Sequence, residues 1–206
     1  SSDVCSSDLM FPDDGDTVEA LLQKADVALY QVKNSGRGDY RFFSADMNRE
    51  LEDQFDLESR MGGALRNGQI QWWYQPQIDL ATGVLVGAEA LARWIQPDGT
   101  SIPPDAFIPV AEKFGHIQQL GELALRSACT EARKWAQACG RPIPVAVNLS
   151  AVQFHRPGLT EMVRAMLTET GLPAAHLILE ITESVLMEDN ITTRESLAGL
   201  ANLGVG

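Results

Sequence analysis

Two kinds of hydrophobic pattern follow one another along the chain. In the first third, apolar residues recur at helical spacing from Leu21 to Val32, which predicts a helix over about 17–33. Tyr40–Phe43 is typical of a short strand, and residues 48–68 again have helical spacing. One helix and one strand bury too little surface to fold alone. We therefore expect this first part to be the end of a larger domain followed by a connecting helix.

From Gln69 onward, apolar strands alternate with amphipathic helices. We predict strands over 70–78, 84–94, 145–148 and 177–181, and helices over 105–138 with a break near Gly115, 158–170 and 191–203. About four residues join the first two strands, too few for a crossover helix, so these strands should be antiparallel. A further strand is expected to start at Val205.

The later alternation defines the expected fold class, an α/β protein with a largely parallel sheet covered by helices. A closed β/α barrel needs eight strands and about 250 residues. Residues 69–206 supply only half of that number of strands. The expectation is an incomplete (β/α) TIM-like barrel with an antiparallel first strand.

Composition and charge narrow the class of protein. The formal net charge is −12, from 28 acidic and 16 basic residues. This excess of acid argues against binding to a nucleic-acid polymer, which requires Lys and Arg. No apolar run approaches the length of about 20 residues that spans a bilayer. The 3 cysteines exclude a disulfide framework. A cytoplasmic location is the expectation, with any membrane anchor encoded outside this chain.

Three apolar strands each carry one oxygen-donor side chain, namely Glu89, Asn148 and Glu180. Charges in buried strands are costly unless they are paired or bound to a metal. Two carboxylates and one amide oxygen, without Cys or His, suit a hard cation such as Mg²⁺ or Mn²⁺ rather than zinc. The alternative is that each is a strand-end residue satisfied by a hydrogen bond or salt bridge.

Five motifs follow one another in this part. They are Tyr74-Gln75-Pro76, Gly87-Ala88-Glu89-Ala90-Leu91-Ala92-Arg93-Trp94, Phe107-Ile108-Pro109-Val110-Ala111-Glu112, Asn148-Leu149-Ser150 and Glu180-Ile181-Thr182-Glu183-Ser184. In this order they resemble the motifs of the EAL domain family of cyclic di-GMP phosphodiesterases. The resemblance covers roughly 58–206, and the family's modified barrel also has an antiparallel first strand.

The resemblance implies a role for each matching residue. Glu89, Asn148 and Glu180 would be ligands of Mg²⁺ or Mn²⁺, with two ions in a complete domain. Gln75, Leu91 and Arg93 would bind cyclic di-GMP, with Arg93 holding a phosphate. Glu183 would support the loop that completes the site. The implied reaction is metal-assisted hydrolysis of cyclic di-GMP to linear pGpG.

The earlier part contains three further stretches with a family resemblance, namely Phe11–Gly15, Ala25–Tyr30 and Lys33–Arg37. They resemble the C-terminal end of a GGDEF diguanylate cyclase domain, whereas the GGDEF signature itself is absent from the sequence. We therefore expect residues 1–10 to be uninformative or artefactual, 11–46 to be a GGDEF remnant and 47–68 to be a linker helix. Residues 69–206 would be the N-terminal part of an EAL domain.

The family's Asp-Asp-Phe-Gly motif and its catalytic Lys would follow Gly206. No catalytic base is therefore expected within the chain, and the 206-residue fragment should be inactive alone. The alternatives are a degenerate EAL domain that binds cyclic di-GMP as a receptor, or an unrelated Mg²⁺-dependent barrel or scaffold. The resemblance also implies a homodimer through the EAL domain.

Overall fold

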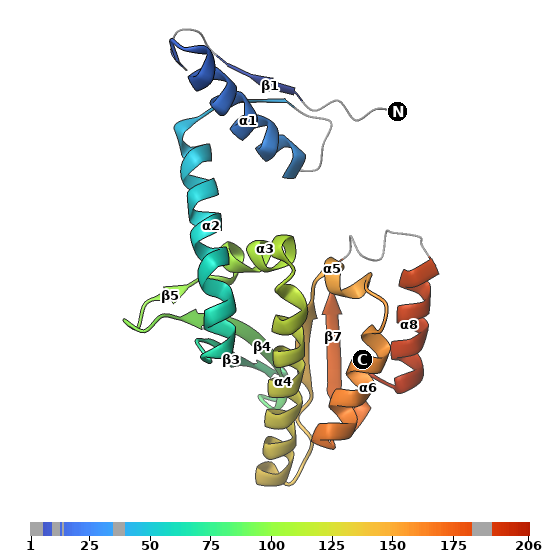
Figure 1. Ribbon diagram of the computed structural model, residues 1–206. Coiled ribbons are helices and arrows are strands. Elements are labelled where there is room, and N and C mark those ends of the chain that lie inside the picture. The colour runs from blue at the N-terminus through green and yellow to red at the C-terminus, as the bar shows by residue number, and fades with distance from the viewer. Residues whose placement is uncertain (1–5, 10–12, 14, 35–39, 183–190) are drawn as a thin grey trace. The chain divides into compact units, whose positions relative to one another are not determined.

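The computed structural model describes residues 6–9, 13, 15–34, 40–182 and 191–206. The chain divides into two compact units between Leu57 and Glu58. Helix α2 (Ala45–Arg66) begins in the first unit and ends in the second. Figure 1 shows the elements with the labels used below.

The first unit contains two parallel strands and the helix that connects them. Strand β1 (Ser6–Asp8) pairs with β2 (Tyr40–Phe42), and α1 (Val18–Asn34) lies between them in the chain. Ala28 and Val32 of α1 are completely buried. The predicted helix and the predicted short strand are confirmed. Strand β1 was not predicted, because a run of Ser and Asp carries no hydrophobic strand signal.

The second unit is a mixed sheet in the order β3-β4-β6-β7, with β5 paired to β4. Its strands are β3 (Ile70–Ile78), β4 (Leu85–Ile95), β5 (Ser101–Ile102), β6 (Val145–Leu149) and β7 (Leu177–Ile181). Strands β3 and β4 are antiparallel, as their short connection predicts, whereas β4, β6 and β7 are parallel. The expected α/β class is confirmed, with parallel pairing from β4 to β7 and antiparallel pairing of β3 and β5 with β4.

The long helices follow the strands as the periodicity predicts, and two short helices lie among them. They are α3 (Pro104–Phe114), α4 (Ile117–Cys139), α5 (Ala151–Phe154), α6 (Leu159–Thr170), the short 3₁₀ helix η1 (Ala174–His176) and α8 (Ile191–Leu203). The break expected near Gly115 is present, and Gly115 ends α3 with a φ of 83°, a conformation that favours glycine.

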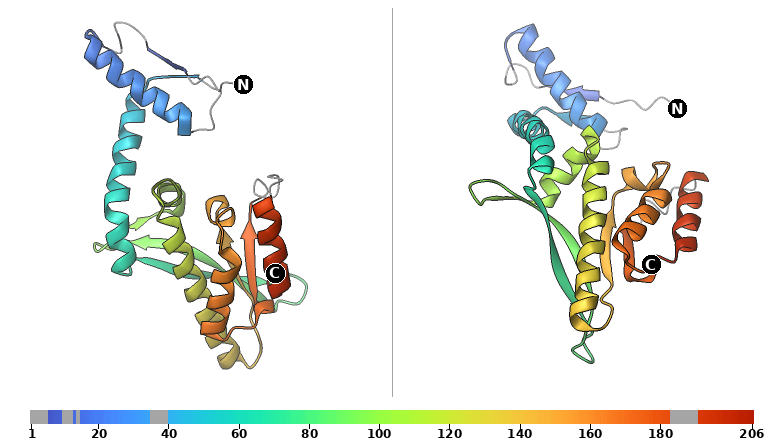
Figure 2. Two further views of the ribbon diagram at one scale, coloured as in Figure 1. Left: turned by 45° about the vertical axis from the view of Figure 1, so that its right-hand side comes forward. Right: turned by 60° about the horizontal axis from the view of Figure 1, so that its bottom comes forward.

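One continuous hydrophobic core joins α4 and α6 to the sheet. Val145, Val147 and Leu149 of β6 alternate onto the helix-covered face, where they belong to one buried cluster with residues of both helices. Leu200 of α8 extends the same core. Figure 2 shows these helices beside β6 and β7 in two further orientations. The residues of β6 and β7 that lie between the core positions therefore belong to the opposite face.

Three short elements were not predicted from the sequence. Strand β5 forms because a turn folds the chain back onto β4, with a backbone hydrogen bond from the N–H of Gln96 to the carbonyl of Thr100. Helix α5 has only four residues and depends on a cap at Ser150. The 3₁₀ helix η1 also has too few residues for a periodic signal.

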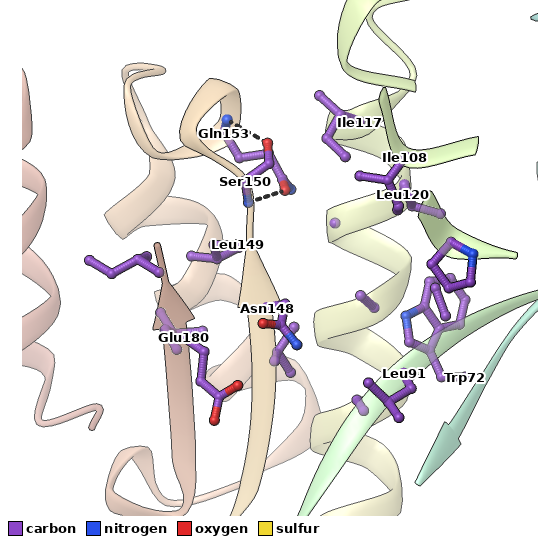
Figure 3. Close-up of a pocket in the computed structure, with 18 of the residues that line it drawn as sticks. Trp72, Leu91, Ile108, Ile117, Leu120, Asn148, Leu149, Ser150, Gln153 and Glu180 are labelled. Carbon is purple, nitrogen blue, oxygen red and sulfur yellow. Dashed lines mark hydrogen bonds between the residues drawn. The ribbon is translucent and has the colours of Figure 1, made fainter. Parts of the chain in front are cut away.

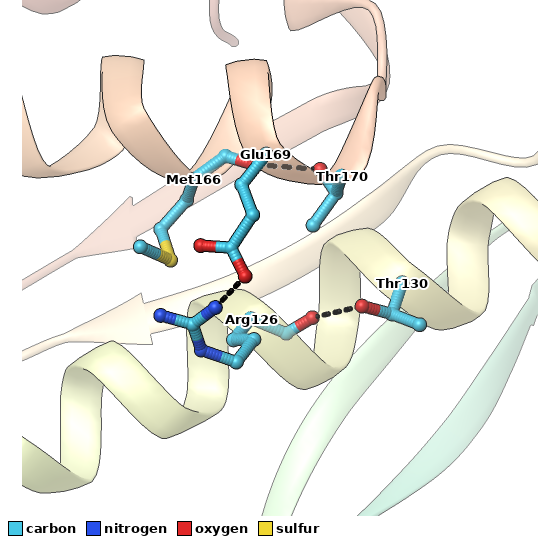
Figure 4. Close-up of polar contacts among 5 residues, drawn as sticks. All are labelled: Arg126, Thr130, Met166, Glu169 and Thr170. Atoms are coloured by element: carbon cyan, nitrogen blue, oxygen red, sulfur yellow. Dashed lines mark hydrogen bonds and ion pairs between the residues drawn. The ribbon is translucent and has the colours of Figure 1, made fainter.

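An ion pair links the outer surfaces of α4 and α6, where Arg126 donates to Glu169 (Figure 4). Thr130 and Thr170 donate their hydroxyl hydrogens to carbonyls one turn back in the same helices. Both members of the ion pair are substantially exposed, so its contribution to stability is about 1 kcal/mol or less. The buried core, rather than this pair, holds the helices on the sheet.

After α8 the chain returns to the free edge of β7. The backbone N–H of Gly206 donates to the carbonyl of Leu177 at 3.0 Å, and the carbonyl of Gly206 accepts from Leu179 at 2.9 Å. This is the parallel pairing expected for a strand that starts at Val205. Separately, none of the described helices is both long enough and apolar enough to cross a membrane.

A truncation in the core tests this packing. Leu125 of α4 is fully buried, whereas Leu80 in the β3–β4 turn is 99% exposed. Leu125→Ala should lower the free energy of unfolding by about 2–5 kcal/mol, because it removes buried methyl groups and leaves a cavity. Leu80→Ala is the control and should leave the urea midpoint almost unchanged. Equal midpoints for the two variants would contradict the assigned core.

Candidate functional site

The register of the sheet brings the predicted site residues to one face. In β4, Glu89 is opposite Gln75 of β3 on one side and Ala146 of β6 on the other. Asn148 of β6 is in turn opposite Glu180 of β7. Because side chains alternate along a strand, Glu89, Asn148 and Glu180 all lie on the face opposite the helical core.

Direct contacts confirm that two of these residues meet. The side-chain amide of Asn148 donates from Nδ2 to Oε1 of Glu89 at 2.8 Å. Asn148 is exposed, whereas Glu89 and Glu180 are half-buried. With its amide group directed to Glu89, Asn148 keeps its Oδ1 atom as an acceptor. Two carboxylates and one amide oxygen therefore gather at the sheet surface.

The electrostatics of this group link Glu180 to Glu89. The pKa of Glu180 is raised above its ordinary value, first because burial disfavours the charged carboxylate and second because Glu89 is negative. The two carboxylates are thus close enough to repel one another. A cation placed between them would relieve the repulsion and replace the water lost on burial.

A cleft of about 830 Å³ opens beside this group. Asn148, Glu180 and Leu91 line it from the sheet, and Trp72 of β3 also contributes (Figure 3). The opposite wall comes from α3 and α4 and includes Ile108 and Leu120. The cleft forms where β4 and β6 separate, since the bridges between these strands end at Ala90 and Val147.

Three further predicted site residues are Gln75, Arg93 and Glu183. Gln75 and Arg93 are on the same sheet face as Glu89 but do not line the cleft. Arg93 donates from Nη1 to the carbonyl of Ala92 at 2.8 Å, and its guanidinium lies 5.8 Å from the centre of the Trp73 ring. Glu183 lies outside the described residues.

The cleft also contains polar residues to which sequence reasoning gave no role. They are Glu112, Ser150, Gln153 and Thr182. The spacing of Ser150 and Gln153, three residues apart directly after a strand, is that of a helix capping box. This signal could have identified Gln153. Glu112 and Thr182 fall inside the quoted motifs, but nothing in their spacing indicates that they face a cleft.

The donor set fits a hard divalent cation. No group of three or more His, Cys, Asp or Glu side chains in the described ranges has the arrangement of a metal site. The group at Glu89, Asn148 and Glu180 instead combines two carboxylates with an amide oxygen, ligand types used for Mg²⁺ and Mn²⁺. The fold and the site thus define an α/β domain with an acidic, oxygen-rich site on one face of its sheet.

Comparison with known proteins identifies the family. Residues 59–206 match the EAL domain, and the chain belongs to the EAL domain family. It is 43% identical over 196 residues to an uncharacterized signaling protein of Caulobacter vibrioides, covering 95% of this chain and 24% of that protein. It is 40% identical over 197 residues to the bifunctional diguanylate cyclase/cyclic di-GMP phosphodiesterase MucR of Pseudomonas aeruginosa. This match covers 96% of this chain and 29% of MucR. The chain therefore spans less than a third of the length of each of these relatives.

Solved structures agree in fold. The chain superposes on the PaMucR phosphodiesterase in its cyclic di-GMP complex with a TM-score of 0.70 at 40% identity, covering 73% of this chain and 61% of that one. The EAL enzyme Bd1971, bound to cAMP and cyclic di-GMP, gives a TM-score of 0.71 over 94% of this chain and 51% of that one. At 22% identity this second likeness shows the fold alone.

Removing one charge at the site should stabilise the cation-free chain. Glu180→Gln eliminates the repulsion from Glu89. The urea midpoint of this variant at neutral pH should therefore be higher than that of wild type, and its free energy of unfolding should be larger by about 0.5 kcal/mol. The effect is small because the site is partly exposed. Since the folded-state pKa of Glu180 is raised, the wild-type carboxyl gains protons and stability as the pH falls through that pKa. The advantage of the variant should therefore shrink in acid.

The matched control is Glu122→Gln, which removes an exposed carboxylate from α4. Its midpoint should show no comparable rise at neutral pH. A Glu180→Gln variant that is less stable than wild type at neutral pH would show that the carboxylate makes a favourable contact instead.

Proposed function

We propose that the protein to which this chain belongs hydrolyses cyclic di-GMP to linear pGpG, with Mg²⁺ or Mn²⁺ as cofactor. The observation that carries the proposal is the convergence of Glu89, Asn148 and Glu180 on one sheet face, at the edge of a cleft. The relatives support it, because MucR and NbdA of Pseudomonas aeruginosa are both named cyclic di-GMP phosphodiesterases at 40% and 38% identity.

The three oxygen-donor residues would hold the divalent ion. The observation that supports the fit is the raised pKa of Glu180, which reflects burial and the nearby Glu89 carboxylate. When bound, such an ion would polarise a phosphodiester oxygen and lower the pKa of a water molecule. The hydrogen bond from Asn148 to Glu89 orients both side chains before any ion arrives. Two ions are expected in a complete domain.

The dinucleotide would lie across the sheet face and into the cleft. Leu91 provides an apolar surface within the cleft. Arg93 would bind a phosphate through its forked donors, keeping its contact to the ring of Trp73. Gln75, which is exposed and opposite Glu89, supplies an amide next to the same carboxylate. Glu183, which lies outside the described residues, is proposed to support the loop that completes the site.

Other groups are needed for full activity. The 206 residues contain no Asp-Asp-Phe-Gly motif, and the described part of the site includes no lysine. We therefore propose that residues following Gly206 supply the Asp pair and the Lys that acts as base, and complete the barrel. The 206-residue chain should then bind divalent ions weakly and turn over little substrate.

The first unit is proposed to be the end of a GGDEF domain, with residues 11–46 as its remnant and 47–68 as the linker helix. The match to MucR supports this proposal, because it covers 96% of the chain and so extends beyond the EAL region. Association of two EAL domains into a homodimer is the corresponding proposal for oligomeric state.

Turnover of cyclic di-GMP by the full-length protein tests the proposed function. With Mg²⁺ or Mn²⁺ present, Glu89→Gln and Asn148→Ala should each reduce kcat/KM by about 100-fold or more, the scale of removing one directly acting electrostatic group. Glu122→Gln, on the exposed surface of α4, is the matched control and should retain full activity. The 206-residue chain assayed in parallel should show almost no product.

Two results would contradict parts of this proposal. Tight binding of cyclic di-GMP by the full-length protein without any pGpG would favour the receptor function. Measurable turnover by the 206-residue chain would show that its own residues complete the site.

A further inference from the structure

The turn directly after β6 is held by a reciprocal pair of hydrogen bonds. Ser150 is the N-cap residue of α5, and its Oγ accepts from the backbone N–H of Gln153 at 3.4 Å. In return, Oε1 of Gln153 accepts from the backbone N–H of Ser150 at 3.1 Å. The side chain of Gln153 therefore fixes the backbone two residues beyond Asn148, where β6 ends.

Gln153 is buried to an extent unusual for a polar side chain. It is only 3% exposed, and its Nε2 atom has no hydrogen-bond partner among the described residues. Figure 3 shows Gln153 at the end of β6, on the side of the cleft across from Ile117 and Leu120 of α4. A buried donor without a partner is unfavourable, so the position of this amide needs an explanation.

The amide group occupies space that only glycine leaves open. A Cβ atom on Gly121 of α4 would lie 1.7 Å from Nε2 of Gln153, well inside contact distance. Gly121 is itself unfavourable in the interior of a helix. Its neighbours Leu120 and Leu125 are buried in the packed part of the domain, so α4 is a fixed surface. Gln153 thus lies between a rigid helix and the Ser150 turn, which follows the strand β6 that carries Asn148.

We propose that Gln153 and Gly121 form a brace that positions Asn148. Gln153 is a positioning residue: it acts on the end of β6 through the Ser150 turn. Two locally unfavourable features, a helix-interior glycine and an unpartnered buried amide, occur at one contact, as expected where function opposes stability. The value of an oriented Asn148 for ion binding rests on the proposed function, whereas the brace itself does not.

The side-chain amide signal of Asn148 in an ¹⁵N-edited NMR spectrum reports the brace directly, because that amide donates to Glu89. Gly121→Ala, which displaces Gln153, should shift this signal, and so should Gln153→Ala. In the Gln153→Ala background, Gly121→Ala should cause no further shift, since no side chain remains to collide with it. Gly63→Ala is the control, because a Cβ on this helical glycine meets no atom within 4 Å.

Gln153→Met separates packing from hydrogen bonding and is the variant to use where Gln153→Ala does not fold. It keeps a long buried side chain but cannot accept from Ser150, so the Asn148 signal should still shift. In the full-length protein, Gly121→Ala should raise the Mn²⁺ concentration for half-maximal turnover by about 10–100-fold, the range for residues that orient metal ligands. Its kcat at saturating Mn²⁺ should fall much less.

An unchanged Asn148 signal in folded Gly121→Ala and Gln153→Met variants would overturn the proposal, because a purely structural contact alters stability alone. Shifts that add independently in the double variant would also overturn it. The NMR result does not require activity: the expected shifts in a protein without turnover would support the brace and contradict only the proposed function.

Discussion

The parallel pairing of β4, β6 and β7 is the constraint on which the rest of the site depends. This pairing sets Asn148 opposite Glu180 and Glu89 opposite Ala146. A shift of one residue in any strand would turn its polar side chain toward the hydrophobic core. The hydrophobic core on the helical side therefore fixes the register of the strands, and this register places the three polar side chains together.

The site shows why such a register must be enforced by packing. Burial raises the pKa of Glu180, and repulsion from the Glu89 carboxylate raises it further. The hydrogen bond from Asn148 to Glu89 offsets only part of this cost. Like charges placed close together lower stability, and such groups are common at functional sites. The proposed bound cation would remove this cost.

Most of the second unit could be predicted from the sequence. The apolar strands alternate with long amphipathic helices, so the hydrophobic pattern predicted β3, β4, β6 and β7. The short connection between β3 and β4 fixed their direction. Elements of two to four residues, such as β5 and α5, were missed because they depend on specific turns and caps rather than on periodicity.

Prediction of the site was uneven for physical reasons. Glu89, Asn148 and Glu180 could be found because a polar residue in an apolar strand is conspicuous. The position of Arg93, which contacts Trp73 and its own strand rather than the cleft, depends on side-chain rotamers that a sequence does not specify. The contact between Gln153 and Gly121 joins segments far apart in the chain, so only the folded structure reveals it.

Paramagnetic broadening by Mn²⁺ in the full-length protein is the most direct test of the central claim. Substoichiometric Mn²⁺ should broaden the side-chain amide signal of Asn148 first. The signal of Gln137, near the opposite end of α4 and outside the cleft, should stay sharp. Broadening of Asn148 that disappears in Glu89→Gln and Glu180→Gln variants is the predicted result. An Asn148 signal that stays sharp while other acidic regions broaden would contradict a divalent-ion site at the sheet surface.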